Sequence, residues 1–135
     1  MAKRILIYTN HFYPEQFKIN EIVDWLSEEG HTIRVVTGLP NYPSGKYYKG
    51  YGILSMFKTN YKKNITVNRL PLIPRGNANY LMLILNYLSY FISTFLFTIY
   101  LLFKKRYDYI FVHHTSPILI AIHPLVYSFF YKKTK

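Results

Sequence analysis

Residues 4–38, RILIYTNHFYPEQFKINEIVDWLSEEGHTIRVVTG, decide the fold of this chain. The stretch holds two short apolar runs, Arg4–Thr9 and Thr32–Thr37, which are rich in β-branched residues and typical of buried strands. Between them, Lys18–Glu29 carries apolar residues at helical spacing, and Gly30 follows where a helix C-terminal cap is expected. A strand, a helix and a strand joined by short loops predict a right-handed parallel βαβ unit.

The rest of the chain extends this unit. Ile65–Leu70 alternates apolar and polar residues and predicts a third strand, nearer an edge, whereas the apolar run Tyr109–Val112 predicts a fourth. Leu39–Asn60 is rich in proline and glycine and predicts a long loop. Two further helices are expected over Tyr80–Phe103 and Ile118–Tyr131. We therefore predict one α/β domain, residues 1–135, with a Rossmann-like parallel sheet of strand order 3-2-1-4 and helices on both faces.

The composition limits the partners and the chemistry. The chain has 17 Lys and Arg residues against 6 Asp and Glu residues, a formal net charge of +11. This charge favours nucleic acid, anionic lipid or phosphorylated substrates without choosing among them. No nucleic-acid-binding motif accompanies it, so we expect no nucleic-acid partner. The absence of cysteine excludes disulfides and thiolate chemistry and fits a cytoplasmic protein, and the N-terminus lacks the pattern of a secretory signal.

Three of the predicted loops leave the carboxyl ends of parallel strands, the edge at which open α/β sheets bind ligands. They begin at Asn10, Leu39 and His113, and we expect them to converge in space. Arg69, in the third strand, and Arg75, in the turn after it, have the planar fork that suits a diphosphate, although a solvated or lipid-facing arginine is the alternative. The residues expected to bind substrate are Asn10, Tyr13, Asn41, Tyr42, Lys46, Arg75, Thr115 and Ser116.

Four residues in these loops are candidate catalytic residues: His11, Glu15, His113 and His114. His11 and Glu15 have the groups needed to position or deprotonate a hydroxyl, but Glu15 has the alternative role of stabilising a helix N-terminus by its charge. His113 and His114 are adjacent on a strand, so their side chains point to opposite faces and a shared metal is not expected. We predict no metal site and no cofactor.

The segment 80–103 has no charged residue and is long enough to cross a bilayer. One interpretation is a transmembrane helix with a cytoplasmic basic anchor. The other is a helix that packs partly on protein and lies partly on lipid headgroups, because it contains several polar residues and tyrosines. The residues expected to face the membrane are Tyr80, Leu83, Tyr87, Phe91 and Phe95, with Lys104, Lys105 and Arg106 at its basic flank.

Several strings in the chain resemble the N-terminal domain of family 4-like GT-B glycosyltransferases. They are YPE (13–15), EEGH (28–31), TGLPNYPSGK (37–46), VNRLPLIPRGN (67–77), NYLSYF (86–91) and VHHTSPI (112–118). The nearest group makes O-antigen, capsule and colanic acid and includes fucosamine-type transferases. The resemblance covers nearly the whole chain, and TGLPNYPSGK is its most specific part.

The resemblance implies a metal-independent enzyme of two Rossmann-like domains. Its N-terminal domain would face a polyprenyl-diphosphate-linked acceptor at the inner leaflet of the plasma membrane, on the cytoplasmic side. Its C-terminal domain would hold most of the contacts to the nucleotide-sugar donor. Such enzymes act by stabilising the departing diphosphate electrostatically.

Two departures from the family pattern matter. Many relatives have a Gly-Gly pair in the first loop, where this chain has residues 16–20, QFKIN. Relatives also continue into a donor-binding domain beyond the position of Lys135, so we expect the chain to be a partial N-terminal domain without transferase activity by itself. The alternatives are a small non-catalytic membrane protein with one or two apolar helices, which predicts no sheet, and a remnant that binds a partner chain carrying the other half.

Overall fold

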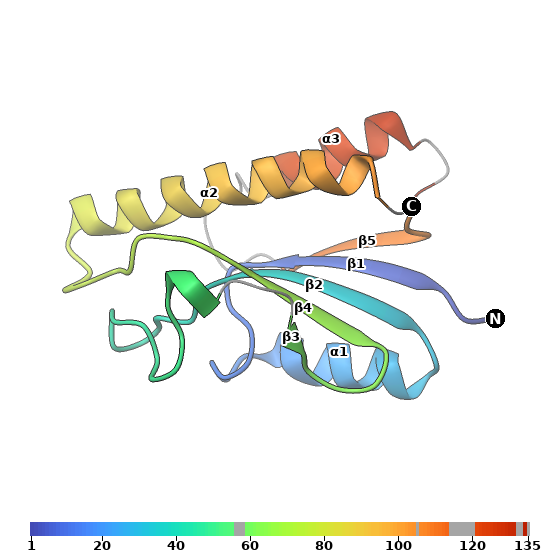
Figure 1. The fold of residues 1–135 in the computed structure, drawn as a ribbon, viewed down its shortest axis with the longest axis horizontal. Helices are drawn as coiled ribbons and strands as arrows, with labels where there is room; N and C mark the ends of the chain where they lie inside the picture. The colour runs from blue at the N-terminus through green and yellow to red at the C-terminus, as the bar shows by residue number, and fades with distance from the viewer. Residues whose placement is uncertain (56–58, 105, 114–120, 132–133, 135) are drawn as a thin grey trace.

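The computed structural model describes residues 1–55, 59–104, 106–113, 121–131 and 134. It contains a twisted sheet with the order β3-β4-β2-β1-β5 (Figure 1). The four predicted strands are all present and parallel, in the predicted order 3-2-1-4. They are β1 (Arg4–Thr9), β2 (Thr32–Gly38), β4 (Ile65–Leu70) and β5 (Tyr109–His113).

The stretch Leu39–Asn60 is not loop throughout, as the sequence had suggested. It contains a short 3-10 helix, η1 (Ile53–Ser55), and a two-residue strand, β3 (Thr59–Asn60), which runs antiparallel to β4. A strand of two residues has no measurable periodicity, so its pairing with β4 depends on the tertiary structure.

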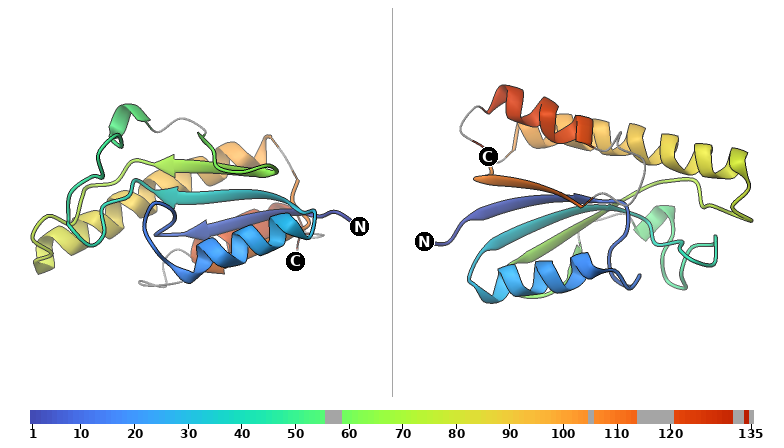
Figure 2. Two further views of the ribbon diagram at one scale, coloured as in Figure 1. Left: turned by 90° about the horizontal axis from the view of Figure 1, so that it is seen from below. Right: turned by 180° about the vertical axis from the view of Figure 1, so that it is seen from behind.

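Helices cover both faces of the sheet, as predicted (Figures 1 and 2). α1 (Lys18–Glu28) lies on one face, and α2 (Tyr80–Leu102) and α3 (Ile122–Phe130) lie on the other. Gly30 follows α1 with φ +84°, which supports the expected C-terminal cap because this conformation favours glycine. Residues 118–120 of the helix predicted over 118–131 lie outside the described residues.

The alternation of side chains along the strands divides the core into two layers. On β1, Ile5 and Ile7 point toward α1, and Leu6 and Tyr8 point toward α2. The layer under α1 is aliphatic apart from Phe12. The layer under α2 and α3 is rich in tyrosine, and its buried members are Leu6, Tyr8, Val36, Leu70, Leu72, Tyr90, Leu101, Tyr107 and Tyr127.

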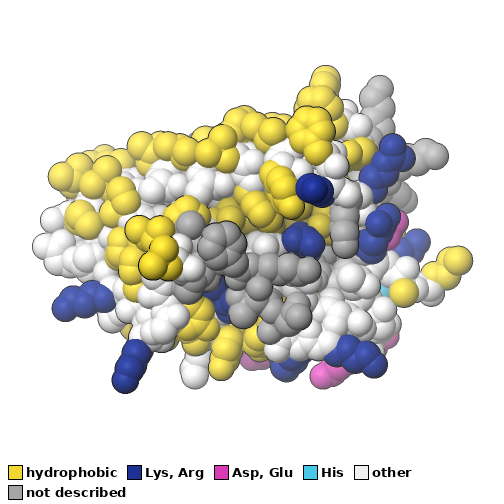
Figure 3. All heavy atoms as spheres, in the orientation of Figure 1, with side chains coloured by type: hydrophobic (Ala, Val, Ile, Leu, Met, Phe, Trp, Pro, Cys, Tyr) yellow, Lys and Arg dark blue, Asp and Glu magenta, His cyan; other side chains and the backbone are white. Residues whose placement is uncertain are grey.

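The long helix α2 turns its polar residues toward the sheet. The Tyr90 hydroxyl donates to the Thr9 carbonyl oxygen (2.8 Å), and the Asn86 amide donates to the Ile73 carbonyl oxygen (2.6 Å). The helix begins after Asn79, whose side chain accepts from the backbone N–H of Met82 (2.9 Å) as an N-cap. Its outward face is apolar, and Figure 3 shows hydrophobic side chains gathered along the edge formed by α2 and α3.

Candidate functional site

Three loops meet at the carboxyl ends of the parallel strands. They are residues 10–17 after β1, 39–52 after β2 and 71–79 after β4. The first two were predicted to converge. Arg75 was among the predicted substrate-binding residues, but the loop after β4 was not expected to join the first two, because that loop is short and its contacts span the chain. The residues that join the loops are His11, Glu15, Asn41 and Arg75.

Glu15 is the centre of this arrangement. Its side chain is 1% exposed, and its Oε1 accepts from the backbone N–H groups of Asn41 (2.8 Å) and Tyr42 (2.7 Å). Its Oε2 lies 2.7 Å from Nδ1 of His11. These partners compensate for the burial of a carboxylate, which would be costly without them. Glu15 therefore ties the first loop to the second through its carboxylate.

His11 links Glu15 to Arg75. Its Nε2 lies 2.9 Å from Nη2 of Arg75, and its ring stacks on Phe17 with centroids 4.8 Å apart and planes at 10°. The Arg75 guanidinium also lies over the rings of Tyr42 and Tyr87, each 5.4 Å from the centroid. The Nε–H of Arg75 is buried and donates to no group in the described part of the chain. The Arg75 guanidinium, with one N–H group that has no described partner, is thus held among aromatic rings.

The second and third loops also bind each other directly. The Asn41 side-chain oxygen accepts from the backbone N–H of Arg75 (3.2 Å), and the Gly45 carbonyl oxygen accepts from the N–H of Gly76 (2.9 Å). Asn41 is almost fully buried, with 1% exposure. The three loops consequently form one hydrogen-bonded unit above the sheet.

His113 lies at the end of β5, next to the first loop. In the parallel register it faces Thr9, and its Nδ1 lies 3.1 Å from the Thr9 hydroxyl, which donates to the His11 carbonyl oxygen. His113 is half-buried and so borders the same edge of the sheet. The other candidates in this stretch, His114, Thr115 and Ser116, lie outside the described residues.

The remaining predicted substrate-binding residues differ in their surroundings. Asn10 is buried, whereas Tyr13 is exposed and its ring lies 5.1 Å from that of Tyr61. Lys46 is exposed, and its backbone N–H donates to the Ser44 hydroxyl. Tyr13 and Lys46 thus lie on the surface of the loops, outside the hydrogen bonds centred on Glu15.

The other arginine considered for a diphosphate, Arg69, lies beneath the first loop. Its Nη2 donates to the Tyr13 carbonyl oxygen (2.6 Å), and its guanidinium lies over the ring of Tyr51. It is 2% exposed, and this burial lowers the pKa of Arg69. Its location supports a role in holding the first loop in place.

The residues of α2 predicted to face a membrane differ in their exposure. Tyr80 is exposed, whereas Leu83, Tyr87, Phe91 and Phe95 are half-buried. Phe91 and Phe95 pack against His123 of α3. Several large apolar side chains that are exposed on α2 each follow a predicted residue by one position, and they were not among the predicted ones. They are Leu81, Ile84, Leu88, Ile92 and Leu96. α2 is therefore rotated about its axis by one residue relative to the prediction. The sequence feature that indicates the buried face is the four-residue spacing of Asn86, Tyr90, Thr94 and Thr98.

The basic flank of α2 is exposed. Lys104 lies over the ring of Tyr100, and Arg106 lies over the ring of Tyr131. Lys105 lies outside the described residues. Within the described ranges, no three His, Asp or Glu side chains are grouped to hold a metal ion.

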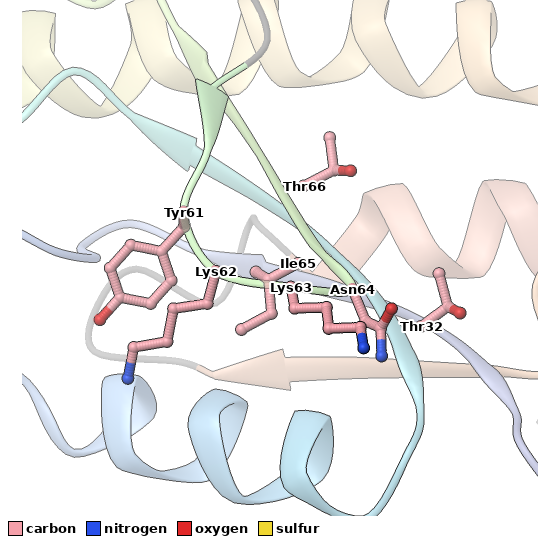
Figure 4. A pocket seen from close by; sticks show the side chains of 7 residues that line it. All are labelled: Thr32, Tyr61, Lys62, Lys63, Asn64, Ile65 and Thr66. Atoms are coloured by element: carbon pink, nitrogen blue, oxygen red, sulfur yellow. The ribbon is translucent and has the colours of Figure 1, made fainter.

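A cavity of about 380 Å³ lies at the opposite end of the sheet (Figure 4). It is lined at the starts of β2 and β4 by residues that include Thr32, Lys62 and Ile65. Lys62 forms an ion pair with Asp24 of α1, with a separation of 2.7 Å. Parallel α/β sheets bind ligands at the carboxyl ends of their strands, so this cavity is not the candidate site.

No family model matches the chain. The chain is 31% identical over 99 residues to the protein named "Putative colanic acid biosynthesis glycosyl transferase WcaI" of Escherichia coli (strain K12). The alignment covers 68% of this chain and 23% of that protein, so the chain spans about a quarter of its relative's length. This similarity and the parallel sheet support a glycosyltransferase-like, Rossmann-like α/β fold.

Proposed function

We propose that this chain is the acceptor-facing part of a glycosyltransferase of surface-polysaccharide synthesis. The reaction would move a sugar from a nucleotide-sugar to a lipid-linked acceptor, with the donor held mainly by a second domain. The observation that carries this proposal is the joining of three loops at the carboxyl ends of β1, β2 and β4 through Glu15, His11 and Arg75. The similarity to a colanic acid glycosyl transferase supports the reaction class.

The acceptor would bind through its diphosphate, and Arg75 is the residue proposed to contact it. A guanidinium forms paired hydrogen bonds to phosphate oxygens, and Arg75 has a buried Nε–H without a described partner. The loop that carries Arg75 leads directly into the N-cap of α2. A diphosphate bound there would lie near the start of the apolar helix.

The apolar face of α2 and α3 would lie on the inner leaflet of the plasma membrane. α2 is 23 residues long and apolar enough to span a bilayer by length and composition alone. Its polar residues, however, bond to protein: Ser93 donates to the Pro71 carbonyl oxygen (2.7 Å), and the Tyr8 and Thr98 hydroxyls are 2.9 Å apart. One packed face and one apolar face support a helix that lies in the interface rather than one surrounded by lipid.

The alternative function is a small membrane protein without catalysis, and the length of α2 is the observation that favours it. That alternative predicts no sheet, whereas the described residues form a five-stranded sheet. Carbonate washing of membranes discriminates between them, because a spanning helix resists the wash and an interfacial one is released. Retention of the chain in washed membranes would favour the alternative.

The proposal is tested with nanodiscs that contain a polyprenyl-diphosphate-linked sugar. We expect the chain to bind these more tightly than nanodiscs with the polyprenyl monophosphate. Arg75→Ala should weaken binding about tenfold or more, because a hydrogen bond to a charged group contributes roughly 1.5–3 kcal/mol. Lys63→Ala removes one exposed charge at the opposite end of the sheet and should change binding much less. Equal binding to both lipids would contradict the proposal.

Sugar transfer itself is measured with a radiolabelled nucleotide-sugar. The 135-residue chain alone is expected to bind acceptor without transferring sugar, because donor contacts and exclusion of water from the reaction need a second domain. Turnover by the chain alone would refute this expectation. Turnover that appears when the remainder of a related transferase is added in trans would support the assignment.

A further inference from the structure

We propose that Glu15 and His11 are positioning residues that orient Arg75 toward a diphosphate. The inference rests on the proposed function for its ligand. It assigns to His11 and Glu15 a role different from proton transfer to or from a hydroxyl.

The hydrogen bonds have one possible direction. A guanidinium only donates, so His11 Nε2 accepts from Arg75 Nη2 across 2.9 Å. An imidazole that accepts at Nε2 carries its proton on Nδ1, and this N–H donates to Glu15 Oε2 across 2.7 Å. Because the Glu15 carboxylate only accepts, the order carboxylate, neutral imidazole and guanidinium is internally consistent.

Burial holds the side chains of the two positioning residues in fixed positions. His11 and Glu15 are both buried. The second carboxylate oxygen of Glu15 is held by the N–H groups of Asn41 and Tyr42, and the His11 ring is stacked on Phe17. A side chain held by packing and by hydrogen bonds loses little further freedom when a ligand binds.

The same contacts leave His11 without a nitrogen available for catalysis. A general base must accept a proton on an accessible lone pair within hydrogen-bond distance of a substrate hydroxyl. In His11, the Nε2 lone pair is directed at Arg75 and the other nitrogen bears the proton bonded to Glu15. The side chain that remains able to meet a ligand is Arg75, which is only half-buried, in contrast to His11 and Glu15.

The direct test is the tautomer of His11 in the unmodified chain. Long-range proton–nitrogen NMR correlations distinguish a neutral imidazole protonated on Nδ1 from one protonated on Nε2. We expect His11 to carry its proton on Nδ1 at neutral pH. Protonation on Nε2 would overturn the proposal, because that nitrogen would then be unable to accept from Arg75.

The second test uses inorganic pyrophosphate as the probe and calorimetry as the measurement. His11→Phe keeps an aromatic ring for stacking but removes both hydrogen bonds, and should weaken pyrophosphate binding about tenfold. His11→Gln supplies an amide oxygen for Arg75 and should recover much of the loss. Circular dichroism verifies the fold of each variant, and Lys63→Ala serves as the charge-matched control for Arg75→Ala.

The outcomes separate the two proposals. If Arg75→Ala binds pyrophosphate as the unmodified chain does, the proposed diphosphate contact is wrong. If Arg75→Ala loses binding while His11→Phe retains it, the contact stands and the positioning role is wrong. If His11→Phe does not fold, the tautomer measurement still decides the question.

Discussion

The loops that follow β2 and β4 touch at a pair of glycines. A Cβ atom added to Gly45 would lie 1.8 Å from the carbonyl oxygen of Gly76, far inside van der Waals contact, and Gly45 has φ +72°. Both features require glycine at this position. Because Arg75 precedes Gly76, this approach of two backbones also sets the position of the guanidinium in the site.

Gly45→Ala is therefore expected to destabilise the protein more than Gly50→Ala. Gly50 has φ +84° but no atom within 4 Å of an added Cβ, so its substitution introduces only the conformational cost, roughly 1–2 kcal/mol. Gly45→Ala adds a clash with backbone that cannot be relieved by a side-chain rotation. Urea unfolding measures the difference, and equal losses in the two variants would show that the loops separate without cost.

At the scale of the element, the polar and apolar faces of α2 are exchanged relative to those of an ordinary surface helix. Its sheet-facing side includes Asn86, Thr94 and Thr98, and its outward side is apolar. α3 attaches to the same helix through His123, which is fully buried and donates from Nε2 to the Phe91 carbonyl oxygen (3.1 Å). Its Nδ1 is buried without a partner in the described part of the chain, so a proton added there would be desolvated.

The attachment of α3 is expected to depend on pH. Burial lowers the pKa of His123 from 6.5 to about 4. In that interval the unfolded chain binds a proton that the folded chain does not. The free energy of unfolding should therefore fall as the pH drops from about 6.5 to about 4, by at most about 3 kcal/mol from this residue.

Replacement of His123 by phenylalanine removes the titrating group and retains a ring for Phe91 and Phe95. The pH dependence of unfolding between about 4 and 6.5 should become shallower in this variant. Thermal unfolding over a series of pH values provides the measurement. An unchanged slope would assign the acid sensitivity to other groups.

At the scale of the whole molecule, the proposed membrane contact combines apolar side chains with positive charge. The outward faces of α2 and α3 expose Leu88, Leu96, Leu125 and Phe129 among other large apolar residues. The formal net charge of +11 attracts an anionic surface before any apolar contact forms. This combination is the one that an interfacial protein uses.

Leu88→Asp is expected to weaken binding to anionic lipid vesicles about tenfold or more, since burial of a leucine contributes roughly 1.5–3 kcal/mol. Trp25→Asp is the matched control, because Trp25 is an exposed apolar residue on α1, on the opposite face of the sheet. Both variants change the net charge by the same amount. Co-sedimentation with vesicles is the measurement, and equal losses would exclude the α2 face as the contact.

Local patterns were enough to predict much of the fold. The β-branched runs of β1 and β2, the helical spacing of α1 and the glycine after it led to the βαβ unit, and short connections then restricted the order of the four long strands. They also pointed to His11 and Glu15, because loops at the carboxyl ends of parallel strands share one edge of the sheet, and to Arg75, because a guanidinium suits a diphosphate. Such patterns repeat within a few residues and so require no knowledge of distant contacts.

Only the tertiary structure decided what those side chains do. Glu15 finds its backbone partners 26 and 27 residues away, and His11 meets Arg75 across 64 residues. The four-residue spacing along α2 marks its buried face, but the partner that each polar side chain finds there, such as the Thr9 carbonyl oxygen for Tyr90, depends on distant segments. A buried polar group is stabilised by whichever partner packing brings within about 3 Å, and that choice depends on the arrangement of the whole chain.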